Sequence, residues 1–120
     1  MDEIEKKVLI VEGKTDREKV KKLLNEPVEI ICTHGTISFT KLEELINLIE
    51  DREIYILVDE DDAGHKLRKI LKRELPNAQH LYTQSVYKEV AETPLMYLAK
   101  ILMNANFRID QRYLFNGGAT

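Results

Sequence analysis

The sequence predicts an α/β protein of three layers, in which helices cover both faces of a central, mainly parallel sheet of about four strands. Three short apolar runs, at 7–11, 28–32 and 54–58, are typical of strands buried on both faces. A segment with apolar residues at helical spacing follows each run, and this alternation requires right-handed crossovers between parallel strands. Because 120 residues are too few for a second core, we expect one domain over residues 1–110 and a flexible tail over residues 111–120.

Two Thr-x-x-Glu capping boxes predict where the first two helices begin. Thr15 is expected to start the helix that follows the strand at 7–11, and Thr40 the helix that follows the strand at 28–32. The third-position partners in the two boxes are Glu18 and Glu43.

The second half of the chain contains the strongest strand, at 54–58, followed by four acids and by a helix with an apolar face over 63–75. A weaker strand is expected at about 78–82. Thr93-Pro94 predicts the start of the last helix, with threonine as the N-cap and proline at the first helical position. The stretch between them admits a short strand over 86–90 or only a loop.

Composition excludes several classes of protein. Lys and Arg number 18 against 21 Asp and Glu, a formal charge of −3, so any contact with nucleic acid must depend on local basic residues. Cys32 is the only cysteine and cannot form an internal disulfide. The N-terminus has neither the apolar region of a signal peptide nor a membrane span. We therefore expect a cytoplasmic protein with no membrane partner.

Acidic residues gather where two of the predicted strands end. Glu12 follows the first strand, and Asp59 and Asp61 follow the third. Ligands of open parallel sheets bind beyond the carboxyl ends of the strands, so a strand order of 2-1-3-4 would bring these carboxylates together. Their repulsion costs about 1 to 4 kcal/mol per close pair, and a divalent cation would relieve it. Oxygen ligands without His or Cys favour Mg²⁺ or Mn²⁺. The simpler alternative is that Asp61 and Asp62 only cap a helix, which explains neither Glu12 nor Asp59.

Three motifs make the chain recognisable: Val11-Glu12-Gly13-Lys14-Thr15-Asp16, Thr33-His34-Gly35-Thr36 and Val58-Asp59-Glu60-Asp61-Asp62-Ala63-Gly64. In this order they resemble the Toprim domain shared by topoisomerases, bacterial primases, OLD-family nucleases and ribonuclease M5. The resemblance covers about residues 6–90 and is strongest to small stand-alone Toprim proteins and to the N-terminal domain of ribonuclease M5. It implies a Rossmann-like fold and chemistry on RNA or DNA that depends on Mg²⁺. Mn²⁺ would be able to replace Mg²⁺ in this role.

The resemblance also implies residue roles. Glu12 would act as general acid/base or metal ligand, and Asp59 and Asp61 would bind the metal. The positions that would shape the surrounding loops are Gly13, Asp16, Gly35 and Gly64. His34 and Asp62 are further candidates because they lie within the motifs.

Basic residues form two clusters on the first and third helices. The members are Lys14, Arg17, Lys19, Lys21 and Lys22, and Lys66, Arg68, Lys69, Lys72 and Arg73. Lys14, Arg17 and Lys66 lie within a turn of the carboxylates and are the candidates for contacts with the phosphate backbone. The distal members Lys22, Lys72 and Arg73 are expected on solvated helix faces. Tyrosines such as Tyr82 match no nucleophile motif and are expected to pack against the fold.

Three functions remain open from the sequence. The first is a Mg²⁺-dependent nuclease or phosphotransferase, in RNA processing for example, with water as the nucleophile and Glu12 moving a proton. The second is a non-catalytic module that binds metal-bridged phosphate or nucleic acid for a protein partner supplying further domains. The third, more distant, is a phosphoacceptor receiver domain using Asp59 and Thr83, although the acidic pair expected after its first strand is missing.

Overall fold

The computed structural model describes residues 6–34, 37–83 and 86–115, and its centre is a parallel sheet of four strands. Their order is β2-β1-β3-β4, as the sequence predicts. The strands are β1 (Lys7–Val11), β2 (Glu29–Cys32), β3 (Glu53–Leu57) and β4 (Gln79–Leu81). In the register of the two central strands Ile10 pairs with Ile56, so β1 and β3 end side by side at one edge of the sheet.

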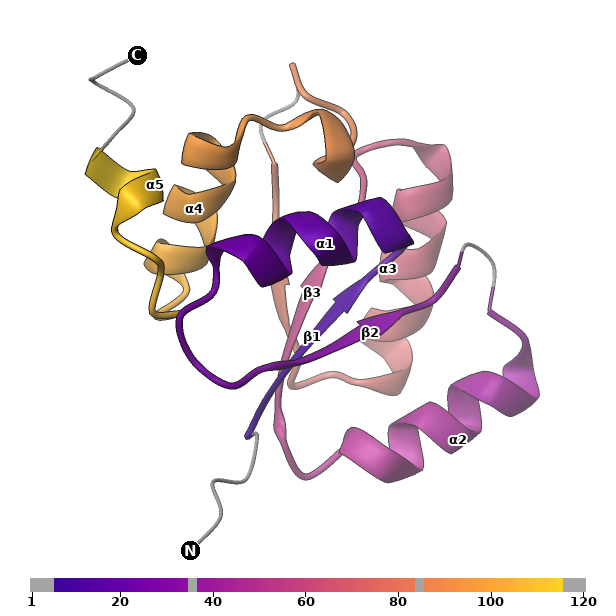
Figure 1. The fold of residues 1–120 in the computed structure, drawn as a ribbon. Helices are drawn as coiled ribbons and strands as arrows, with labels where there is room; N and C mark the ends of the chain where they lie inside the picture. Colours follow the sequence, from indigo (N-terminus) through magenta and orange to yellow (C-terminus); the bar gives the residue numbers. More distant parts are fainter. Residues whose placement is uncertain (1–5, 35–36, 84–85, 116–120) are drawn as a thin grey trace, which may run out of the picture.

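Helices cover both faces of this sheet, which confirms the predicted fold class. In Figure 1, α1 and α4 lie in front of the strands and α3 lies behind them. The main helices are α1 (Lys14–Leu23), α2 (Phe39–Ile49), α3 (Asp62–Glu74) and α4 (Leu95–Asn104). Two shorter ones are the 3₁₀ helix η1 (Val90–Glu92) and α5 (Arg112–Phe115). No helix in the described part of the chain is both long and apolar enough to cross a membrane.

Side chains of β1 alternate between two hydrophobic layers. Leu9 and Val11 pack with α1 and α4, while Val8 and Ile10 pack with α2 and α3. All four are fully buried. Because both faces of the strand are covered, the sequence shows an unbroken apolar run instead of an alternating pattern.

Two of the predicted helix starts are wrong by a short distance. The N-cap of α1 is Gly13, whose amide donates a 3.1 Å hydrogen bond to Asp16 Oδ2, so Thr15 lies inside the helix. The N-cap of α2 is Ser38, whose hydroxyl accepts a hydrogen bond from the Lys41 amide, so Thr40 also lies inside. In α2 the Ser38 hydroxyl satisfies one of the first free amides of the helix, whereas in α1 the Asp16 carboxylate accepts from the N-cap amide of Gly13.

Of the two alternatives left open for the segment after β4, the structure shows the loop, whereas the predicted start of the last helix is wrong. Residues 86–89 form turns and bends and no strand, and they lead into η1. Thr93 does not cap α4, whose N-cap is Pro94, because the Thr93 hydroxyl donates to the Glu89 carbonyl. The flexible tail was expected from residue 111; α5 lies within it, and residues 116–120 are outside the described residues.

Candidate functional site

Glu12 and Asp59 meet at the carboxyl edge of the sheet. Glu12 directly follows β1 and Asp59 lies two residues after β3, and the Asp59 amide donates a 2.7 Å hydrogen bond to Glu12 Oε1. The contact joins residues 47 positions apart in the chain. It exists because β1 and β3 are neighbouring parallel strands that end level with each other.

Each of the three expected site carboxylates is held by a backbone amide. Besides the Glu12 contact, the Val90 amide donates to Asp59 Oδ1 and the Gly64 amide donates to Asp61 Oδ1, both at 2.8 Å. Within the described residues, the second oxygen of each of these carboxylates accepts no hydrogen bond. The amides therefore orient the carboxylates and leave one oxygen of each available to a ligand.

Asp16 adds a fourth carboxylate to the cluster from the first turn of α1. Its side chain is only 6% exposed. Burial raises the pKa of Asp16, and the Asp59 carboxylate raises it further. Burial likewise raises the pKa values of Glu12 and Asp59, to which the neighbouring carboxylates add. The cluster thus stores repulsion that a cation would relieve.

The donor set fits a hard divalent cation held by few protein ligands. As the side chains stand, no three Asp, Glu, His or Cys residues within 6–34, 37–83 and 86–115 form a group that could hold a metal ion. Mg²⁺ is typically bound by one or two carboxylates, with water and substrate phosphate completing its shell. Asp59 and Asp61, each with one oxygen that accepts no hydrogen bond within the described residues, are the carboxylates that could supply such ligands.

The glycines of the motifs differ in how strictly the structure requires them. A Cβ atom added to Gly64 would lie 1.9 Å from the Asp59 carbonyl oxygen, so no side chain fits there. At Gly13 the nearest such contact is Asp16 Oδ2 at 3.6 Å, which leaves room for a Cβ. Gly35 lies outside the described residues. Gly64 therefore allows the start of α3 to approach the Asp59 backbone.

The predicted phosphate-binding cations are all exposed, and one of them shares a hollow with Glu12. Lys14 and Arg17 lie on the first turn of α1. Lys66 and Asp62 of α3 line a hollow of about 450 Å³ together with Glu12. The remaining lining is apolar: Ile37, Ala63, Leu67 and Ile70.

His34 is placed by its backbone. Its φ of 56° lies in the left-handed region, and its amide donates a 2.7 Å hydrogen bond to the Glu12 carbonyl. The side chain itself is exposed. This conformation is uncommon for a residue with a Cβ, and here it ties the loop after β2 to the residue after β1.

Arg68 was expected in an exposed basic cluster, and this expectation is wrong. Its side chain is 4% exposed. The guanidinium donates to the carbonyls of Val58 and Leu81 and forms a 2.7 Å ion pair with Glu60. In the sequence, Arg68 looks like the other basic residues of its helix, because all of them are interspersed with apolar positions. No sequence pattern therefore predicts that Arg68 is buried.

The segment before α4 was also missed as part of the site. Val90 donates to Asp59, and the Glu60 amide donates to the Lys88 carbonyl over 2.6 Å. The charge of Glu89 contributes to the raised pKa of Asp16, although burial is the largest cause. These contacts come from backbone groups and one acid in a stretch without periodicity, so no pattern could have pointed to them.

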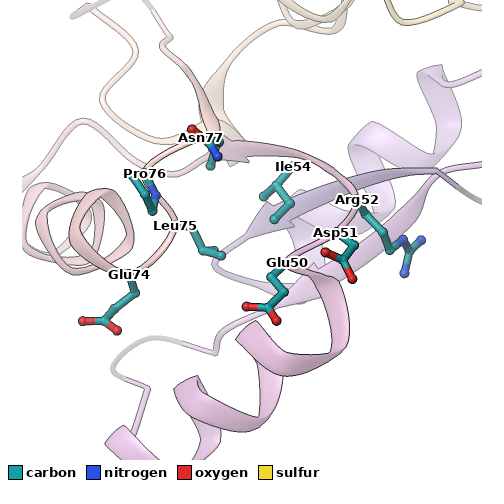
Figure 2. A pocket seen from close by; sticks show the side chains of 9 residues that line it. Glu50, Asp51, Arg52, Ile54, Glu74, Leu75, Pro76 and Asn77 are labelled. Atoms are coloured by element: carbon teal, nitrogen blue, oxygen red, sulfur yellow. The ribbon is translucent and has the colours of Figure 1, made fainter.

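A second hollow, of about 250 Å³, lies at the opposite edge of the sheet between the turns that precede β3 and β4 (Figure 2). Its lining residues are Glu50, Asp51, Arg52, Ile54, Glu74, Leu75, Pro76, Asn77 and Ala78. Arg52 forms an ion pair with Glu29 of β2. Because these residues lie at the amino ends of the strands, the hollow is not part of the carboxylate site.

The fold and these carboxylates define a class of protein: the chain belongs to the Toprim domain family, which matches residues 7–91. A solved structure, "small TOPRIM domain protein from Bacillus stearothermophilus", is 46% identical and superposes with a TM-score of 0.90. The match covers 94% of this chain and 96% of that one. The family assignment replaces the receiver alternative, and Thr83 is buried with its hydroxyl donating to the Tyr87 carbonyl.

Two protein relatives illustrate the range of the family. "Uncharacterized protein YusF" of Bacillus subtilis is 53% identical over 114 residues, which cover 95% of this chain and 77% of the relative. "Ribonuclease M5" of Fusobacterium nucleatum is 35% identical over 81 residues, covering 68% of this chain. The match spans only 44% of that ribonuclease. The Toprim family and the similarity to ribonuclease M5 support a function related to nucleic acid.

Proposed function

We propose that this chain carries out Mg²⁺-dependent phosphodiester chemistry on RNA or DNA, as a nuclease or phosphotransferase, at the carboxylates of Glu12, Asp59 and Asp61. The observation that carries the proposal is the hydrogen bond from the Asp59 amide to Glu12, which joins the acid after β1 to the Asp-x-Asp segment after β3. Similarity to "Ribonuclease M5" proteins supports RNA as one substrate class.

The proposed role of Glu12 is proton transfer at the attacking or leaving oxygen. Burial and the charges of Asp59 and Asp61 raise its pKa, so a proton is held more readily than on a solvated glutamate. Asp59 and Asp61 would hold the cation, with Glu12 as a third candidate ligand. When bound, Mg²⁺ or Mn²⁺ supplies charge stabilisation at the phosphoryl oxygens and lowers the pKa of bound water.

Three cations are proposed to position the phosphate backbone. Lys66 lines the same hollow as Glu12. Lys14 and Arg17 extend from the first turn of α1, whose N-cap is the residue after Glu12. Contacts of this kind fix the position of a nucleic acid without reading its sequence. They also allow a chain with a net charge of −3 to bind a polyanion at one edge.

A second candidate is a module that binds nucleic acid or metal-bridged phosphate without turnover, in a complex whose partner supplies the remaining machinery. The observation favouring it is coverage, since the chain matches less than half the length of the ribonuclease M5 relatives. In either case we propose a cytoplasmic location, from the single cysteine Cys32.

Incubation of the pure protein with labelled structured RNA, single-stranded DNA and duplex DNA tests the two candidates. Each substrate is assayed with Mg²⁺, Mn²⁺ or EDTA. Divalent-dependent cleavage that Asp59→Asn abolishes would support the enzyme, and binding without cleavage would support the module. Asp51→Asn is the matched control, because Asp51 is an exposed acid at the opposite edge of the sheet. If the protein neither cleaves nor binds any of these substrates, both candidates are overturned.

A further inference from the structure

Tyr82 presents an aromatic ring beside the carboxylate site. It directly follows β4, whose carboxyl end lies next to that of β3, and Leu57 and Leu81 are partners in that register. Packing was expected for this residue, yet its side chain is 49% exposed. The exposed ring therefore stands at the same edge of the sheet as Asp59 and Asp61.

The ring is held in position by Arg68. The guanidinium carbon lies 4.1 Å from the ring centroid, so the cation covers one face of Tyr82. Arg68 is in turn fixed by the carbonyls of Val58, which directly follows β3, and of Leu81, which ends β4. A ring backed by a buried, multiply bonded cation is preorganised, which lowers the entropic cost of binding a flat ligand.

The same guanidinium connects the ring to the Asp-x-Asp segment. Arg68 Nη2 lies 2.7 Å from Glu60 Oε2, and Glu60 stands between the two aspartates. Tyr82 is therefore separated from the metal-binding segment by one side chain. A nucleic acid whose phosphodiester reaches Asp59 and Asp61 would have a neighbouring nucleotide within reach of this ring.

Positive charge lies along the same side of α3. Lys72 is one turn after Arg68 and is exposed, and burial, with the charges of Arg68 and then Lys72, lowers the pKa of His80 to about 4. Stacking of a base on an exposed ring and pairing of phosphate with basic side chains are two contacts by which proteins hold single-stranded nucleic acid. The other exposed aromatic, Phe39, has no cation stacked on its ring in the described part of the chain.

We propose that Tyr82, backed by Arg68, is a stacking platform for an unpaired base of the nucleic acid that binds at Glu12, Asp59 and Asp61. The inference rests on the proposed function and narrows its substrate to nucleic acid with at least one unpaired nucleotide next to the reacting phosphodiester. Bases within an intact duplex are already stacked and would not reach the ring.

Binding of oligonucleotides with and without unpaired bases tests the platform. The probes are single-stranded RNA and DNA 12-mers that carry one 2-aminopurine, and the same strands in duplex form, with Ca²⁺ in place of Mg²⁺. Wild type should bind the single strands more tightly and should change the 2-aminopurine fluorescence. Base–aromatic stacking contributes about 1 to 3 kcal/mol, so Tyr82→Ala and Tyr82→Leu should weaken Kd by about 5- to 150-fold.

Two further variants distinguish stacking from loss of structure. Tyr82→Trp should retain the affinity and the fluorescence change, while Tyr82→Leu keeps an apolar cover over Arg68 and should lose both. Tyr113→Ala is the matched control, because Arg112 also lies over that ring, on α5 and away from the site. Wild-type affinity of Tyr82→Leu would overturn the platform while leaving the proposed function intact. Failure of wild type to bind any probe would overturn both.

Discussion

The Lys19 ammonium of α1 donates hydrogen bonds to the Thr93 carbonyl and, over 2.8 Å, to the Ala91 carbonyl. These carbonyls belong to η1 and the residue after it, and η1 begins at Val90, whose amide holds Asp59. A single lysine on the first helix therefore fixes the segment that orients a site carboxylate.

We expect Lys19→Met to destabilise the protein by roughly 1 to 3 kcal/mol, because it leaves two partly buried carbonyls without their donor. For a domain of this size the loss corresponds to a fall in melting temperature of several degrees. Lys21→Met is the control, since Lys21 is exposed on the same helix, and its melting temperature should stay near that of wild type.

Asp59→Asn should melt above wild type in EDTA, because it removes a charge from a cluster in which burial and Asp61 raise the pKa of Asp59. Asparagine keeps the oxygen that accepts from Val90. Mg²⁺ at ten times its dissociation constant should stabilise wild type by roughly 1.4 kcal/mol and the variant much less. Equal responses to Mg²⁺, with a lower melting temperature of the variant in EDTA, would contradict a metal site.

The gain in stability that is expected from Asp59→Asn in the absence of metal should depend on pH. The folded-state pKa of Asp59 lies above its ordinary value of 3.8, so the folded protein binds the proton more tightly than the unfolded chain. Wild type then loses stability as the pH rises from about 3.8 to the raised folded value, and the loss persists above it. The two proteins should converge at low pH in metal-free urea titrations. A constant difference across the range would assign the effect to something other than charge.

His80 should make the protein sensitive to acid. Burial, with Arg68 and Lys72, lowers its pKa from 6.5 to about 4, so its neutral form is favoured in the fold. Stability is therefore lost as the pH falls from 6.5 towards 4, where the unfolded chain binds the proton first. His80→Asn keeps an acceptor for Arg68. In urea titrations, its free energy of unfolding should differ less between pH 7 and pH 5 than that of wild type. The exposed His65, replaced in the same way, should leave the change intact.

Gly64→Ala should cost about 3 kcal/mol, the upper part of the range for overpacking, because the added methyl would meet the Asp59 backbone. Gly13→Ala should cost less than about 1 kcal/mol, since its Cβ has ordinary contacts and only the N-cap preference is lost. Thermal melts of the two variants compare the costs directly. Similar costs would show that α3 can shift away from Asp59.

Much of the fold was predictable because buried strands appear in the sequence as continuous apolar runs and the alternation of strands and helices indicates the topology. The run at 7–11 is apolar throughout because both faces of β1 are covered, and the 2-1-3-4 order brings Glu12 to Asp59. Helix starts were less certain, since Ser38 and Thr40 are both good caps and only the backbone around them decides.

The surroundings of the site were not predictable for a different reason. Arg68 follows Leu67 on α3 with lysines on either side, and its burial is explained by the carbonyls of Val58 and Leu81 and by the Glu60 carboxylate. The Val90 amide contributes through its backbone, which no residue type encodes. Sequence patterns reveal side chains that recur at regular spacing. Each of these contacts occurs at a single position and leaves no such pattern.

The family match ends at residue 91, but the folded unit does not. Leu98 and Leu102 of α4 are fully buried against the sheet, and the Asp110 amide donates to the Leu23 carbonyl at the end of α1. A fragment cut at the family boundary would keep α1 but lose α4, and the apolar side chains that pack against Leu98 and Leu102 would be exposed to water. Any transplant of this site into another protein should therefore carry the chain to at least residue 110, or the recipient must supply a helix in place of α4.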